Sequence, residues 1–107
     1  MGDIEVVDRG SREFVAFLRG DIDESLAEDL DVALGEVAAL EDVDIQRVLV
    51  DLRDVTAMTE PGVKFLVELE RLGRRTGFEV ALSMVSKPAL RALESAHWPH
   101  LPMQSGA

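Results

Sequence analysis

Asp21 and Asp23 are the side chains whose type and spacing most directly suggest catalysis. In phosphoryl transfer, one carboxylate of such a pair can act as the nucleophile and the other as the general acid. Ser83 and Lys87 offer the two further groups that such a site uses. The acidic pair that would hold magnesium late in the chain is missing, because a single acid follows Glu79. A small phosphatase therefore stays open as the enzymatic alternative, and we expect a protein that is not an enzyme.

Two other patterns resemble metal sites, and both are incomplete. A calcium loop that begins at Asp21 requires Gly at its sixth position and Glu at its twelfth, where this sequence has Leu26 and Val32. His97 and His100 lie in a proline-broken tail without a nearby acid, which is weak evidence for a metal site, and an irregular terminus explains them. The chain has no cysteine, which excludes thiolate catalysis, disulfides and cysteine-bound zinc. We predict neither a metal nor a cofactor.

Length and composition indicate one globular domain. The chain has 107 residues, of which 47% are apolar and 30% are charged, an ordinary balance for a folded protein. Its uncharged apolar runs are far too short for a membrane span, and the acidic start lacks the apolar segment of a secretory signal. We therefore expect a cytoplasmic protein without membrane insertion.

The charge of the chain argues against one class of partner. The net charge is −10, and nucleic-acid binding needs a basic face. Residues 1–60 carry 17 acidic and 5 basic side chains, whereas residues 61–107 carry 4 and 6. This asymmetry can steer a charged protein partner, although the acidity also has the simpler role of keeping the domain in solution.

Short apolar runs alternate with amphipathic stretches along the chain. The apolar runs predict strands, and apolar positions three and four residues apart predict helices. Gly20–Asp23 should end the second strand, and Pro61 should begin the helix that Gly77 ends. The sequence therefore predicts an α/β domain with a mostly parallel sheet in the order β-β-α-β-α-β-α. The expected strands are 4–8, 14–18, 48–52 and 78–84, with helices after 23–25, over 61–76 and from 86 onward.

The helix starts and the chain end carry signals of their own. Asp23, Glu24 or Ser25 can cap the first helix, and the Thr59 hydroxyl can cap the second. We expect Trp98 to anchor the tail. A short edge strand around residue 101 would complete a domain of residues 1–103, and residues 104–107 should fray.

Three segments of the sequence resemble the STAS domain, the family of the anti-sigma factor antagonists. Gly20 to Asp23 is similar to the family's Gly-Glu-Leu-Asp-like segment after the second strand. Asp51 to Val63 is similar to its Asp-Leu-x-x-Val-x-x-Met/Ile-Asp-Ser-Ser-Gly-Leu segment, and Ser86–Leu93 resembles the start of its third helix. The resemblance covers Ile4 to Met103. It implies a STAS-like α/β fold and a non-catalytic bacterial regulatory domain that binds an anti-sigma factor.

In this family the regulatory switch lies in the Asp-Ser-Ser-Gly stretch. A partner kinase, itself the anti-sigma factor, phosphorylates the first Ser, and only the unphosphorylated antagonist captures the anti-sigma factor. Carried onto this sequence, the Asp falls on Thr59, the phosphorylated Ser on Glu60 and the second Ser on Pro61, while Gly62 is kept. The family's Asp in the earlier loop falls on Asp23.

Glu60 is the main departure from the family pattern. A carboxylate cannot be phosphorylated, and it places one negative charge at a helix start where a phosphate would carry about −1.5 to −2. Glu60 is thus either a partial phosphomimetic or simply a good helix-start residue beside Pro61. If Glu60 silences binding, Glu60→Ser should bind an anti-sigma partner more tightly. If a partner Lys or Arg recognises the carboxylate, Glu60→Ser should bind more weakly.

We expect the partner surface at one end of the sheet, where two segments each join a strand end to a helix start. The expected partner is an anti-sigma factor or a serine-kinase-type regulator, and a homodimer is compatible with the sequence. One alternative is an accessory subunit of a transporter ATPase or of a stress-signalling scaffold. The enzymatic alternative is the phosphatase, of haloacid-dehalogenase-like type. The expected partner-binding residues are Asp21, Asp23, Glu24, Thr59, Glu60, Pro61, Gly62 and Lys64.

Overall fold

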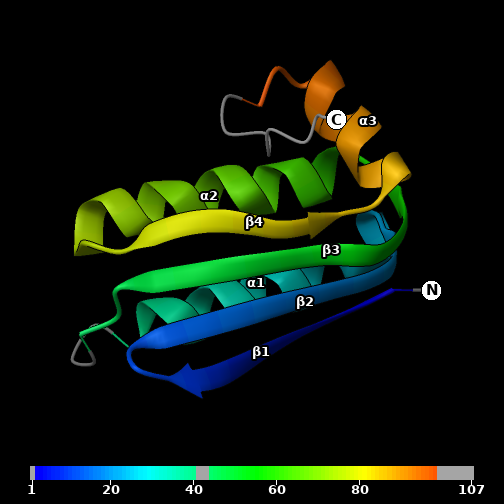
Figure 1. The fold of residues 1–107 in the computed structure, drawn as a ribbon. Coiled ribbons are helices and arrows are strands. Elements are labelled where there is room, and N and C mark those ends of the chain that lie inside the picture. Colours follow the sequence, from blue (N-terminus) through cyan, green and yellow to red (C-terminus); the bar gives the residue numbers. More distant parts are fainter. Residues whose placement is uncertain (1, 41–43, 99–107) are drawn as a thin grey trace.

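The computed structural model of the chain describes residues 2–40 and 44–98. Within these residues, four strands form one sheet and three α-helices pack against it (Figure 1). The order along the chain confirms the predicted α/β arrangement. The expected edge strand around residue 101 and the tail of residues 104–107 lie outside the described residues. The elements are β1 (Asp3–Gly10), β2 (Glu13–Ile22), the 3-10 turn η1 (Glu24–Leu26), α1 (Ala27–Ala38), β3 (Arg47–Met58), α2 (Glu60–Thr76), β4 (Glu79–Val85) and α3 (Lys87–Ser95).

The sheet is mixed and its strands follow the order of the chain, β1-β2-β3-β4. The β1–β2 hairpin is antiparallel, and the β2–β3 and β3–β4 pairs are parallel. Parallel neighbours need a helical crossover, and right-handed crossovers bring successive helices to the same face of the sheet. α1 and α2 accordingly lie side by side over one face, while α3 packs against the carboxyl end of β3 (Figure 1).

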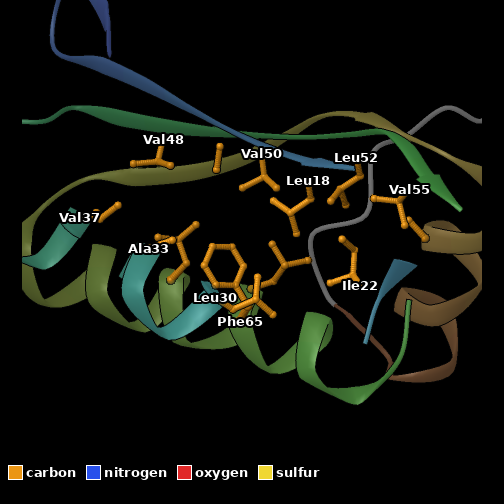
Figure 2. Close-up of a cluster of buried hydrophobic side chains, with 14 of the residues drawn as sticks. Leu18, Ile22, Leu30, Ala33, Val37, Val48, Val50, Leu52, Val55 and Phe65 are labelled. Atoms are coloured by element: carbon orange, nitrogen blue, oxygen red, sulfur yellow. The ribbon is translucent and has the colours of Figure 1, made fainter. Parts of the chain in front are cut away.

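The core lies between the sheet and this pair of helices. In Figure 2, Val48, Val50 and Leu52 point from β3 toward Leu30 and Phe65 on the helices. All five side chains are buried, and each stabilises the fold by about 1.5–3 kcal/mol relative to full exposure. Trp98, the chain's single tryptophan, is 6% exposed and belongs to the same cluster, while the tail that we expect it to anchor lies outside the described residues.

Two strands run further than the sequence predicts. Gly20 does not end β2: it adopts φ +75° at a bulge, where the β2–β3 register shifts, and the strand continues to Ile22. β3 likewise continues past Leu52 to Met58. The prediction followed runs of apolar side chains, whereas the strands persist because backbone hydrogen bonds to a neighbouring strand continue through polar positions. Asp21 is therefore a strand residue and does not lie in a loop.

Candidate functional site

The carboxyl ends of β2 and β3 lie next to each other. The two segments that the sequence predicts to form the partner surface are therefore neighbours in the fold. Asp21 pairs with Ala57 and Ile22 pairs with Met58 in the parallel register. The Thr59 N–H then donates to the Ile22 carbonyl at 3.0 Å. Both strand-to-helix junctions therefore occupy one end of the sheet, as expected.

Asp21 is held by a hydroxyl from the neighbouring strand. Thr56 Oγ1 donates to Asp21 Oδ1 at 2.7 Å. This hydrogen bond favours the ionised carboxylate and lowers the pKa of Asp21 below its ordinary range. The side chain thus links β2 to β3 just before both strands end.

Asp23, the first of the three capping candidates, caps η1, the turn that leads into α1, while α1 itself has Leu26 at its N-cap and no side-chain cap. Asp23 Oδ1 accepts from the Ser25 N–H at 3.0 Å and from the Ser25 hydroxyl at 2.6 Å. Such a cap satisfies a backbone donor that the turn leaves without a partner. The cap fixes the path of the chain through Glu24, whose side chain is exposed.

Three of the four side chains of the phosphatase alternative make local hydrogen bonds. Asp21 bonds to Thr56 and Asp23 bonds to Ser25, while the Ser83 hydroxyl donates to the Val50 carbonyl at 3.4 Å. Each of these side chains serves its local backbone or strand neighbour. In the described part of the chain, no group of three or more His, Cys, Asp or Glu residues is placed to hold a metal ion.

Thr59 is the N-cap residue of α2, but its hydroxyl does not cap the helix. A capping side chain accepts from the second or third N–H of the helix. Here the second residue is Pro61, which has no N–H, and the Gly62 N–H already donates to the Thr59 carbonyl at 3.0 Å. The hydroxyl instead donates to the Ile22 carbonyl at 3.4 Å. The predicted capping role of the Thr59 side chain is therefore wrong.

Glu60 and Pro61 form the first turn of α2, as the sequence predicts. Glu60 is exposed and lies at the positive end of a 17-residue helix, where a carboxylate is favourable. In the described residues no ion pair involves Glu60, whose carboxylate faces solvent. It occupies the position that the family resemblance assigns to the phosphorylated Ser.

Gly62 allows α2 to approach the two strand ends closely. A Cβ atom at this position would lie 2.8 Å from Met58 Cγ and 2.9 Å from Ile22 Cγ2. Both distances are too short for carbon–carbon contact, so any larger residue would push the helix start away from the sheet. Gly62 is buried, and its contribution to the site is to position Glu60 and Pro61.

A hollow between α1 and α2 brings part of this site together. Its volume is about 200 Å³. Sequence reasoning found four of its lining residues, Glu24, Glu60, Pro61 and Lys64, and missed Asp31. Helical spacing from Glu24 through Ala27 to Asp31 was the available signal, since residues three and four apart share one face. The further lining residues are Ala27, Leu30, Leu34, Phe65 and Glu68.

These features define a small α/β domain whose two strand-to-helix junctions form one exposed, acidic surface. Residues 4–101 match the STAS domain. The chain belongs to the STAS domain family, and the resemblance seen in the sequence is confirmed. Within residues 2–40 and 44–98, no helix is both long and apolar enough to cross a membrane.

Solved structures of anti-sigma factor antagonists share this fold. The antagonist from Mycobacterium paratuberculosis is 27% identical, with a TM-score of 0.72 over 97% of this chain and 88% of its own. SpoIIAA in its unphosphorylated form is 10% identical, with a TM-score of 0.74 over 88% and 80%. A STAS domain antagonist from Rhodobacter sphaeroides is 18% identical, with a TM-score of 0.57 over 94% and 97%. A comparison with curated proteins gave no significant match.

Proposed function

We propose that this chain is a non-catalytic regulatory domain that binds an anti-sigma factor of the serine-kinase type without a phosphorylation switch. The observation that carries the proposal is the place of Glu60, at the exposed start of α2 beside the joined ends of β2 and β3. The similarity to anti-sigma factor antagonists supports a protein partner of this kind.

The partner surface in this proposal consists of the two junctions and the first turns of α2. Asp21 and Asp23 hold the β2 end in shape, and Gly62 holds the helix start against it. The residues that contact the partner are then the exposed Glu24, Thr59, Glu60 and Lys64, with Pro61 between them.

Glu60 contributes to binding in this proposal, and does not silence it. Silencing by charge would require the carboxylate to oppose a negative or apolar partner surface, where an unpaired charge is costly. Glu60 shares its hollow with Glu24 and Asp31, so a partner that approaches this surface meets several carboxylates together. Such a surface attracts a basic partner, and for that partner Glu60 is a favourable contact.

The test begins with capture of the partner from the native organism on immobilised chain. An anti-sigma kinase among the captured proteins supports the proposal, whereas a transporter ATPase subunit or a stress-signalling scaffold would replace it with one of the alternatives. Calorimetric titration of that kinase then compares wild type with Glu60→Ser. We expect the variant to bind about 5-fold to 30-fold more weakly, as for the loss of one interfacial charge contact worth about 1–2 kcal/mol.

Asp29→Ser is the matched control. It removes one carboxylate from the first turn of α1, beside a different hollow that faces β1. This variant should bind the partner like wild type. Tighter binding by Glu60→Ser would show that the carboxylate silences the domain, and equal binding would show that Glu60 only starts the helix.

A further inference from the structure

The hollow at the site continues as a groove along the whole α1–α2 pair. A second hollow of about 240 Å³ lies further along the same two helices. The two hollows share Leu34 and Glu68 as lining residues, so they adjoin, and together we call them the groove. The first hollow is lined by the first halves of both helices and the second by their last halves. α1 and α2 therefore run parallel, and the groove follows them from start to end.

Apolar side chains form the floor of the groove, and small residues form its wall on the α1 side. Leu30, Phe65 and Leu72 are buried beneath the groove. Gly35 and Ala38 line the α1 side of the second hollow, and small side chains allow another backbone to come close. A Cβ atom at Gly35 would have no other atom within 4 Å, so this space is open to a docked segment.

The rim of the groove changes sign along its length. Four carboxylates and one ammonium group, that of Lys64, line the hollow at the start of the helices. Arg71 and Arg75 line the hollow at the other end together with Glu68, which also lines the first hollow and pairs with Arg71 at 3.0 Å. No ion pair within the described residues joins α1 to α2, and none involves Glu24, Asp31 or Arg75. Glu24, Asp31 and Arg75 are thus rim charges with which a partner can pair.

Helix dipoles alone do not account for this arrangement. Carboxylates near a helix start and cations near its end compensate the dipole, which explains Glu60 and Arg75. Asp31, however, lies in the second turn of α1, and the last turn of α1 carries no basic residue. From residue 20 to residue 46 the sequence contains ten acids and no lysine or arginine, so the α1 side of the rim stays acidic beyond any dipole effect.

We infer that this groove binds one amphipathic helix of the partner, antiparallel to α1 and α2. The apolar stripe of that helix occupies the floor. Its basic residues lie over the acidic end, and its acidic residues lie over Arg71 and Arg75. In the antiparallel direction the basic residues fall in its carboxyl-terminal half, which also suits its own dipole. From Lys64 to Arg75 the groove spans about 16 Å of helix rise, or about three turns. This inference rests on the proposed function for the identity of the partner.

Synthetic peptides test the inference without the partner. The matched peptide is a helix of about 18 residues with leucines at helical spacing, glutamates in its first half and lysines in its second half. The opposed peptide exchanges the glutamates and lysines. Fluorescence anisotropy with the full chain should show at least about tenfold tighter binding of the matched peptide at low salt, with the preference shrinking as salt screens the charges.

A charge-exchanged chain controls for differences between the peptides themselves. The variant Glu24→Lys, Asp31→Lys, Arg71→Glu, Arg75→Glu keeps the net charge and should invert the preference by a similar factor. The pair Asp8→Lys, Arg9→Glu, on the β1–β2 hairpin, also keeps the net charge and should leave the preference unchanged. Far-UV circular dichroism checks that both variants keep the wild-type fold.

Several outcomes would overturn the inference. Equal binding of both peptides would overturn the antiparallel direction, because the opposed peptide can satisfy the same charges by docking parallel. The same preference in wild type and the exchanged chain would show that the rim charges do not select the order of charges along a bound helix. A further outcome is that wild type forms concentration-dependent dimers and that the exchanged chain cannot dimerise with it. In that case the groove binds a second copy of this chain. If the captured kinase binds the exchanged chain normally but depends on Glu60, the proposed function stands and the groove inference alone fails.

Discussion

The packing of α2 against the strand ends depends on a single hydrogen atom at position 62. The first turn of the helix lies against Met58 and Ile22 so closely that a methyl group would overlap both side chains. Because Glu60 and Pro61 precede Gly62 in the same turn, the position of these two residues and the stability of the core are coupled at Gly62.

Gly62→Ala should destabilise the fold by about 1–3 kcal/mol, because it overpacks a buried contact. Gly35→Ala is the matched control: position 35 lies within α1 with open space around its Cα, so alanine should stabilise by about 0.5–1 kcal/mol. Urea unfolding of both variants measures the difference. An unchanged free energy of unfolding in Gly62→Ala would show that the start of α2 can move away from the sheet without loss of stability.

Asp21 links its protonation to the pairing of β2 with β3. The Thr56 hydroxyl lowers the pKa of Asp21 below its ordinary value of 3.8. A carboxyl group with a lowered pKa stabilises the folded state above the pKa of the unfolded chain. This stabilisation is lost as the pH falls through the lowered folded value.

Thr56→Val should therefore raise the pKa of Asp21 toward its ordinary value and reduce the loss of stability on acidification below about pH 4. NMR titration of the Asp21 carboxyl carbon measures the shift directly. Thr76→Val, which removes a hydroxyl at the far end of α2, should leave that titration unchanged. An unchanged Asp21 pKa in Thr56→Val would contradict the assigned hydrogen bond.

At the scale of the elements, α2 and α3 begin with the same kind of sequence but use different caps. Both place a hydroxyl residue at the N-cap and proline at the second helical position. In α3, Ser86 Oγ accepts from the Ala89 N–H at 3.3 Å. In α2 the equivalent N–H, that of Gly62, is taken by a backbone carbonyl.

Removing the two hydroxyls should thus have unequal effects. Ser86→Ala should lower the free energy of unfolding by about 1 kcal/mol, the usual effect of losing an N-cap side chain. Thr59→Ala should cost less than about 0.5 kcal/mol, since its exposed hydroxyl makes only a long bond to a carbonyl. Chemical denaturation of the two variants side by side tests this order, and equal losses would contradict it.

The elements themselves were largely predictable, and their ends were not. Short apolar runs located the strands of the described chain and apolar periodicity located its helices, because burial imposes both patterns. The extension of β2 through Gly20 depends on a bulge, and a glycine signals a turn and a bulge equally well. The hydroxyl of Thr59 was misjudged for a similar reason: whether an N–H remains for the cap depends on how the turn closes.

At the scale of the whole molecule, the uneven charge of the sequence becomes a difference between two ends of one groove. The prediction of an acidic region and a more basic region rested on charge counts alone. The fold brings acidic α1 beside α2, whose first half lies at the acidic end and whose arginines lie at the other. The sequence could not show this, because Asp31 and Arg75 lie far apart in the chain and meet one groove only through the parallel packing of two helices.

The same charge distribution argues against nucleic acid as a partner. Of the three arginines in the last turns of α2, Arg71 and Arg74 are paired with Glu68 and Glu70 at 3.0 and 2.7 Å. Phosphate binding requires several cations on one face, and this face offers few while the molecule carries −10. The purified chain should therefore not retard duplex DNA at physiological salt.

A variant with lysine in place of four exposed acids of α1 is the positive control for this DNA-binding assay. Replacing Glu28, Asp29, Asp31 and Glu36 adds two charges at each position, which brings the net charge from −10 to −2 and turns one helix face basic. This variant should give a shift that disappears as salt rises, because each neutralised phosphate releases counterions. If wild type also gives a salt-sensitive shift at micromolar concentration, then the molecule has a basic face and the acidic side of the groove does not dominate its field.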